Sequence, residues 1–142
     1  MDIMKLSDEL CQLHITYAGV INRVTNEISA KGEDGIVMWI YSRHQETCPT
    51  DIVRHFNLST GRVTNILRSL EKKQLLFRLH SPEDQRRVCV YLTDKGKSFA
   101  KETYAQMVDR HAKLIELVGA EEMLKMMKLV EHIMILAENN KI

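Results

Sequence analysis

The sequence lacks the long apolar segments that membrane proteins carry. No continuous apolar run approaches the roughly 18 residues of a membrane-spanning helix. The first residues, MDIMKLSDELC, also lack the basic and then apolar layout of a secretory signal peptide. A cytoplasmic protein with no membrane partner is therefore expected. With 142 residues, of which 44% are hydrophobic and 27% charged, the chain is long enough to bury the core of a single domain.

Motifs for metals, cofactors and catalysis are also missing. The three cysteines (11, 48 and 89) are odd in number and widely spaced, which favours neither a disulfide framework nor a CxxC metal site. The six histidines include no i, i+4 pair and no HExxH, so no metal site is expected. There is no glycine-rich phosphate loop, carboxylate pair or nucleophile motif. We therefore expect no cofactor and no enzymatic activity.

The net charge of +1 conceals an uneven distribution. Residues 54–97 contain ten lysines and arginines against four acids, a net charge of +6, so the remainder carries −5. A basic central segment between acidic ends suits a protein that binds nucleic acid through the central segment and not through its ends. From the count alone, an ordinary solvated charged surface is the favoured interpretation.

Long amphipathic helices are predicted at both ends of the chain. Apolar residues recur at spacings of three and four from about Lys5 to Ala30, and the segment 31–35 (KGEDG) is expected to end that helix. A second long helix follows Thr93-Asp94, and a last one runs to about Ala137. We expect residues of about 1–32 and 98–142 to pack together, and against a second subunit, as dimerisation helices of one domain that spans residues 1–142.

The middle of the chain, about 36–96, has the element order of a winged helix-turn-helix. A buried helix (36–43), a short helix (49–56) capped by Cys48 or Thr47, and a helix capped by Ser59 precede a hairpin with the tip SPEDQRR. In the second strand Val88, Val90 and Leu92 alternate with two other residues, which is strand periodicity. The predicted fold is mainly α with a small β-hairpin wing, flanked by the dimerisation helices.

The helix that begins after Ser59 carries side chains of the types that contact DNA. Arginine binds guanine bidentately, asparagine binds adenine, and threonine offers a hydroxyl and a methyl group. The candidates for base contacts are Thr60, Arg62, Thr64, Asn65 and Arg68. Ser59, Lys72 and Lys73 are better placed for phosphates, which position a protein without specifying sequence. For this helix alone, a polar face exposed to water is an equally good explanation.

The hairpin tip provides a second candidate DNA contact. An arginine at a ribbon tip can enter the minor groove, and Arg86 is the candidate. Asp84 either orients a guanidinium or serves as a turn residue. Arg87 is either a DNA contact or a surface charge beside the strand, and the second interpretation is favoured.

The segment SPEDQRRVCVYLTDKG resembles the wing of the MarR family of bacterial transcription regulators. The family pattern is Asp-x-Arg, a short strand and then Leu-Thr-x-x-Gly, which Asp84, Arg86, Leu92-Thr93 and Gly96 match. The resemblance implies a homodimer that binds a pseudo-palindromic operator in double-stranded DNA, usually to repress, with release by a small molecule or by cysteine oxidation. Gln74 departs from the family, which usually has a glycine with positive φ there. The alternative is an architectural or protein-binding winged helix without sequence-specific readout.

The sequence offers two candidates for the input signal. Cys11 lies where peroxide-sensing members of the family carry a reactive cysteine, although a half-buried structural cysteine is the favoured interpretation. The other candidate is a small apolar or aromatic effector that binds between the dimerisation helices and the winged domain. The candidate pocket residues are His14, Tyr17, Met38, Tyr41 and His111. Each of these side chains is also explained as ordinary core.

Overall fold

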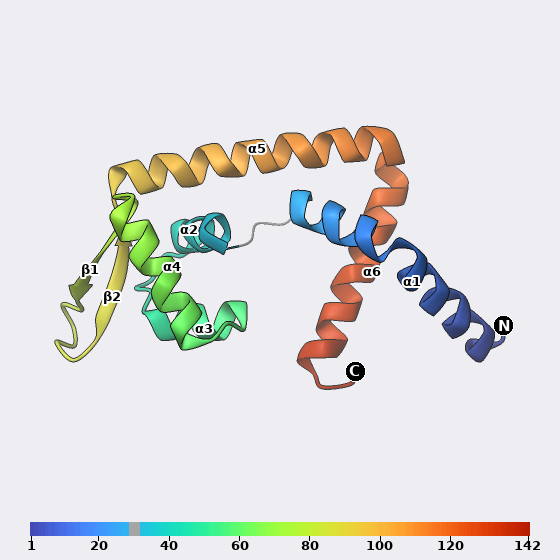
Figure 1. Cartoon of the computed structure of the whole chain (residues 1–142), viewed down its shortest axis with the longest axis horizontal. Coiled ribbons are helices and arrows are strands. Elements are labelled where there is room, and N and C mark those ends of the chain that lie inside the picture. Colours follow the sequence, from blue (N-terminus) through green and yellow to red (C-terminus); the bar gives the residue numbers. More distant parts are fainter. Residues whose placement is uncertain (29–31) are drawn as a thin grey trace. The chain divides into compact units, whose positions relative to one another are not determined.

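The residues described by the computed structural model, 1–28 and 32–142, form six helices and one two-stranded sheet (Figure 1). The elements are α1 (Ile3–Ile28), α2 (Gly32–Ser42), α3 (Pro49–Phe56), α4 (Thr60–Lys72), β1 (Leu76–His80), β2 (Val88–Leu92), α5 (Asp94–Val118) and α6 (Ala120–Glu138). They divide into two units, Met1–Met107 and Val108–Ile142, and α5 passes from the first into the second. The predicted mainly helical fold with a β-hairpin is confirmed.

The core of the first unit is formed where α2, α3, α4 and the hairpin meet. Ile36 and Val37 of α2, Ile52 of α3 and Leu67 of α4 are completely buried. The buried side chains of the strands close the same cluster. Truncating one such side chain to alanine typically costs about 2–5 kcal/mol, so this cluster holds α4 and the hairpin in one arrangement.

The hairpin is antiparallel, with Leu76 opposite Leu92, and a single bridge joins Thr47 to Val90. The predicted alternation in β2 is wrong in one respect, because Val88 is exposed while Cys89 is completely buried. The cause is the segment before α3, which lies against the strand at the Thr47 bridge and covers Cys89.

One predicted helix boundary also needs correction, and α1 departs from a regular helix. The segment 32–35 was expected to follow the first helix as a break, but Gly32 begins α2 and Glu33 lies in its first turn. There Glu33 forms an ion pair with Lys73, which joins the start of α2 to the end of α4. The helix α1 is kinked at Tyr17, where φ is −107° and ψ is 15°. The expected end of this helix at Ala30 lies outside the described residues.

The connection from α4 through the hairpin to α5 is tightly built. Gln74 adopts φ of 61°, the left-handed conformation that glycine favours, so the chain leaves α4 here as it does with the usual glycine of the family pattern. Thr93 donates its hydroxyl to the carbonyl of Gln74 (2.7 Å) and accepts the N–H of Gly96 (2.9 Å). A Cβ on Gly96 would lie 1.9 Å from the carbonyl oxygen of Leu75. Glycine at this position therefore lets the start of α5 approach the start of the hairpin.

The terminal helices have large apolar side chains that remain exposed. In α1 these are Leu6, Leu10, Leu13, Ile15, Tyr17, Val20, Ile21 and Val24; in α6 they are Leu124, Met126, Met127, Leu129, Val130, Ile133, Met134 and Ile135. Met123 is the residue of α6 that is buried. Within the described residues, no helix combines the length and apolar character needed to cross a membrane.

Candidate nucleic-acid interface

A sharp turn between α3 and α4 builds the helix-turn-helix. Asp51 accepts the backbone N–H of Cys48 (2.8 Å) at the start of α3, and Pro49 occupies the first turn, where its missing N–H costs nothing. Asn57 ends α3 in the left-handed conformation with φ of 50°. Ser59 then caps α4 by accepting the N–H of Arg62 (3.2 Å). The predicted caps Cys48 and Ser59 are confirmed.

The helix α4 presents its polar face outward. Val63, Leu67 and Leu70 point into the core, whereas the exposed side chains are those of Thr60, Arg62, Asn65, Arg68, Lys72 and Lys73. Thr64 differs, because it is partly buried and its hydroxyl donates to the carbonyl of Thr60 (2.9 Å). Ser59 uses its hydroxyl as the cap. The exposed candidate contacts on and just after α4 that lack such a local bond are thus two arginines, two lysines, an asparagine and a threonine.

Internal ion pairs separate the cations of α4 and the hairpin into two groups. Arg78 of β1 pairs with Glu71 (2.8 Å), and Lys73 pairs with Glu33. Among the described residues, no acid pairs with the side chains of Arg62, Arg68, Lys72 and Arg86. These four cations are also exposed. Their charge is therefore available to an external anion.

At the tip of the hairpin, Asp84 is a turn residue. Its carboxylate accepts the backbone N–H of Arg86 (3.0 Å), and its carbonyl accepts the N–H of Arg87 (3.0 Å). The structure shows this turn in place of the guanidinium pair that was the other interpretation of Asp84. The turn closes where Ser81 donates its N–H to the carbonyl of Arg87 (2.8 Å). This turn presents Arg86 at the exposed tip.

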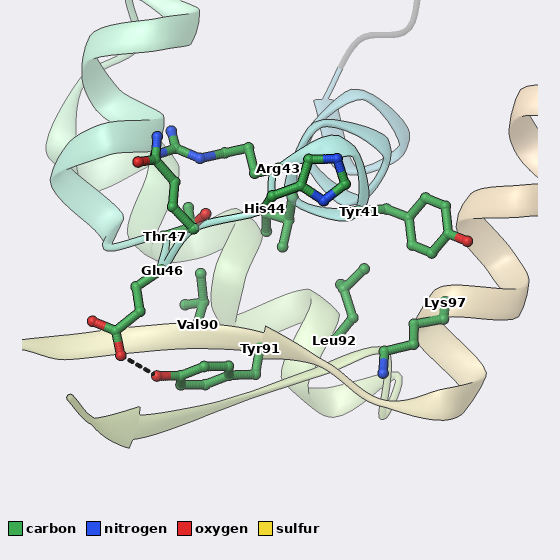
Figure 2. A pocket seen from close by; sticks show the side chains of 11 residues that line it. Tyr41, Arg43, His44, Glu46, Thr47, Val90, Tyr91, Leu92 and Lys97 are labelled. Carbon is green, nitrogen blue, oxygen red and sulfur yellow. Dashed lines mark hydrogen bonds between the residues drawn. The ribbon is translucent and has the colours of Figure 1, made fainter. Parts of the chain in front are cut away.

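Glu46 anchors the base of the hairpin and was missed by the sequence reasoning. Its carboxylate accepts hydrogen bonds from the hydroxyls of Ser81 (2.8 Å) and Tyr91 (2.9 Å), the second of which is drawn in Figure 2. The bonds from Ser81 and then Tyr91 lower the pKa of Glu46, and the bond to Glu46 raises the pKa of Tyr91 to about 12. No local pattern could have identified Glu46, since its partners lie 35 and 45 residues away.

Arg87 is an exposed residue that also contacts the segment before α3. Its guanidinium donates a hydrogen bond to the sulfur of Cys48 (3.1 Å), a contact that raises the pKa of Arg87. This geometry supports the interpretation of Arg87 as something other than a base contact. The loop residues Arg43, His44 and Glu46 line a pocket of about 420 Å³ against β2 (Figure 2).

The proposed effector residues fall on different elements. Met38 and Tyr41 of α2 line one pocket of about 400 Å³ together with Tyr104 of α5. His14 and Tyr17 belong to α1, and the ring of His14 contacts the carbonyl of Leu10 (2.9 Å). His111 is partly buried on α5, in the second unit. Cys11 is exposed on α1, which differs from the buried or half-buried position that the usual burial of cysteine favoured. No group of three or more potential metal ligands occurs in the part of the chain that the structure describes.

The helix-turn-helix followed by a β-hairpin defines a winged helix-turn-helix. Residues 36–88 match the model of the MarR family. The MarR family model thus matches the region from within α2 to the first residue of β2.

The sequence relatives each match part of the chain. A transcriptional regulator of Neisseria gonorrhoeae, FarR, is 39% identical over 62 residues, which are 44% of this chain and 42% of FarR. The uncharacterised transcriptional regulator YfiV of Bacillus subtilis is 30% identical over 86 residues, or 61% of this chain and 54% of YfiV. The chain thus spans about half the length of the curated relatives that it matches.

The structural likeness extends further along the chain. The MepR protein of Staphylococcus aureus, in a crystal structure of its DNA complex, covers 94% of this chain with a TM-score of 0.62, and 96% of that MepR chain is covered. The sequence identity is 18%. At this identity the likeness establishes the fold.

Proposed function

We propose that this chain is a homodimeric, sequence-specific DNA-binding transcription regulator of the MarR type. The observation that carries the proposal is that some cations of this region pair with internal acids while others do not. On α4 and at the hairpin tip, exposed cations lack an internal acid, whereas Arg78 and Lys73 of the same region are paired. Cations left without an internal partner on a winged helix-turn-helix suit the phosphates and base edges of DNA.

In the proposed complex α4 enters the major groove. Residues near the N-terminus of a recognition helix reach base edges, which assigns base contacts to Arg62, Asn65 and Arg68. Ser59 and Lys72 lie at the two ends of the helix and contact phosphates. Arg86 extends from the hairpin tip into the adjacent minor groove, where narrow A·T tracts concentrate negative potential.

The exposed apolar faces of α1 and α6 support the homodimer. Single exposed apolar residues are common on a protein surface, but contiguous helical faces indicate an interaction site. A twofold dimer would place two copies of α4 on half-sites about 34–36 Å apart or a multiple of that spacing, so the operator is pseudo-palindromic. Binding to such a site blocks transcription by occupancy, and a small apolar effector in the pocket beside Met38 and Tyr41 is the proposed release signal.

An architectural or protein-binding winged helix is the second candidate function. The local hydrogen bonds of Thr64 and Arg87 favour it, since each engages a side chain that could otherwise contact a base. The two functions differ in one measurable property. A regulator prefers its operator over random DNA by roughly 10³-fold or more, and an architectural protein does not.

The test begins with selection of binding sites from a random DNA library by the full chain. Affinity for the selected site and for random DNA is then measured by fluorescence anisotropy over a salt series, beside the mass of the protein by analytical ultracentrifugation. We expect a dimer, a pseudo-palindromic selected site, and a preference of at least about 10³-fold. Equal affinity for both DNAs contradicts the regulatory proposal in favour of the architectural one.

Two arginines of the hairpin provide a matched pair of variants. Arg86→Ala is expected to cost about 1–3 kcal/mol of operator affinity, because an external anion loses its cation. Arg78→Ala removes an arginine that already pairs with Glu71 and should change affinity much less. Equal losses in the two variants would show that the hairpin acts through general charge and not through its tip.

A further inference from the structure

Two buried cysteines meet between the start of α3 and the middle of β2. The sulfur of Cys48, which caps α3, lies 3.0 Å from the sulfur of Cys89, and both thiols are free. Cys89 is completely buried, and 6% of Cys48 is exposed. The sequence alone does not indicate this pair, because the two residues are 41 positions apart.

The backbone around the pair has the geometry of two facing strand residues. Thr47 and Val90 form an antiparallel bridge, in which Val90 donates its N–H to the carbonyl of Thr47 (2.8 Å). The next facing pair in that register is Cys48 and Cys89. Facing residues of antiparallel strands have Cα atoms about 4.5–5.5 Å apart. That range lies within the roughly 4.4–6.8 Å that disulfides span, so a bond between these sulfurs requires little backbone movement.

The surroundings of the two sulfurs differ. Cys48 receives a hydrogen bond from the Arg87 guanidinium (3.1 Å) and lies at the N-terminus of α3, so two sources of positive charge face its sulfur. Burial, followed by the hydrogen bond with Cys48, raises the pKa of Cys89 to about 12. Cys48 is therefore the nucleophile, and Cys89 remains a protonated thiol beside it.

We propose that Cys48 and Cys89 form a redox site that hydrogen peroxide oxidises to an intrachain disulfide. The Cys48 thiol first gives its proton to water. The thiolate then attacks one peroxide oxygen, so that an S–O bond forms, the O–O bond breaks and the departing hydroxide takes up a proton to leave as water. The Cys89 sulfur next attacks the resulting sulfenic sulfur of Cys48. The S–S bond forms, the S–O bond breaks, and the departing hydroxide takes the Cys89 proton as a second water. The two thiols lose two electrons, and the peroxide gains them.

The disulfide would fasten the hairpin to the helix-turn-helix. Cys89 belongs to β2 and Cys48 begins α3, so the new bond joins the two elements directly. It also replaces the thiol that accepts the hydrogen bond of Arg87. This inference goes beyond the proposed function and does not depend on DNA binding.

The experiment uses the full chain with Cys11→Ser, which removes the exposed third thiol. The protein is treated with hydrogen peroxide, its remaining thiols are alkylated, and the non-reduced digest is examined by mass spectrometry. We expect a peptide pair linked through residues 48 and 89 that is lost on treatment with dithiothreitol, in a protein that runs as a monomer on a non-reducing denaturing gel. Oxidised protein without that linked pair overturns the proposal.

Further variants test the order of the steps. Cys89→Ala should stop at the sulfenic acid of Cys48, which dimedone traps, whereas Cys48→Ser should leave Cys89 as an alkylatable thiol. Serine is a favoured helix cap, so the second variant is expected to fold, and circular dichroism checks the fold of both variants.

Arg87→Ala should slow formation of the disulfide by roughly tenfold, because Arg87 positions positive charge at the Cys48 sulfur. Arg78→Ala, a change in an arginine paired elsewhere, should not alter the rate. Equal rates in the two arginine variants overturn the role assigned to Arg87, and dimedone labelling of Cys89 in Cys48→Ser overturns the role of Cys48 as nucleophile.

Discussion

Replacement of Gly96 by alanine should destabilise the winged domain more than any other change of one methyl group suggested by the structure. The added Cβ would lie 1.9 Å from the Leu75 carbonyl oxygen, whereas real Cβ atoms essentially never approach within 3.0 Å. The start of α5 and the start of the hairpin must therefore separate by at least 1.1 Å, the difference between these distances. Both partners are backbone, so no side-chain rotation relieves the contact.

The size of the effect follows from the bonds that this separation weakens. Thr93 donates its N–H to the Leu75 carbonyl (3.1 Å) and its hydroxyl to the Gln74 carbonyl (2.7 Å). A net contribution of about 1 kcal/mol for each of these hydrogen bonds gives a loss of about 2 kcal/mol. That value lies within the usual range for overpacking, about 1–3 kcal/mol.

Urea unfolding followed by circular dichroism measures this loss, with all proteins at one concentration because association stabilises the folded state. With a slope of about 2 kcal/mol per molar urea, the midpoint of Gly96→Ala should fall by roughly 1 M. Gly61→Ala on α4 is the matched control, since its Cβ meets nothing within 4 Å. Alanine favours a helix over glycine, so this control should be neutral or more stable by up to about 1 kcal/mol. A similar midpoint for both variants would refute the steric argument.

Two other predictions concern the ends of the hairpin. Gln74→Gly should stabilise the protein by about 1 kcal/mol, because glycine adopts the left-handed backbone at this position without strain. Asn57→Gly is the control: asparagine already tolerates such a backbone, so the gain in stability should be only a few tenths of a kcal/mol. Unfolding midpoints measure both gains, and equal gains would argue against strain at Gln74. Glu46 should make stability depend on pH, since its folded pKa is lowered: the contribution is present above the ordinary value of 4.5 and is lost as pH falls through the lower folded value. Glu46→Gln should flatten the fall in unfolding free energy below pH 4.5, and an unchanged profile would count against the bonds from Ser81 and Tyr91.

Most of the element order could be predicted because local sequence determines it. Ser59 as a cap, Pro49 in the first turn of α3 and the helical spacing of Val63, Leu67 and Leu70 each depend on neighbours within four residues. The sequence left two outcomes open at Gln74, a strained backbone or a different exit from the helix, and the structure shows the positive φ of the first. The start of α2 at Gly32 was missed, because glycine in the first turn is costly and the ion pair from Glu33 to Lys73 is remote in sequence.

The candidate site divides in the same way. The residue types on the exposed face of α4 follow from helical periodicity, so the candidate DNA contacts could be named from the sequence. The sequence could not show which cations are neutralised internally, because Glu71 reaches Arg78 and Glu33 reaches Lys73 only after the hairpin and α2 have packed on α4. The distinction between Arg86 and Arg87 could not be predicted either. Both are adjacent in sequence and exposed, yet only the guanidinium of Arg87 forms a hydrogen bond with Cys48.

The Thr47 bridge explains why so much of the unpredicted chemistry lies in one place. It brings the segment before α3 against β2, and in doing so it buries Cys89 beside Cys48 and sets Glu46 against the hairpin. Periodicity within β2 predicted an exposed Cys89 because it considered only one neighbouring strand. A third backbone segment at the edge of a two-stranded sheet changes which face is buried, and that pairing is a property of the folded chain. The position of the hairpin relative to the helix-turn-helix therefore depends on contacts around this bridge as well as on the apolar core.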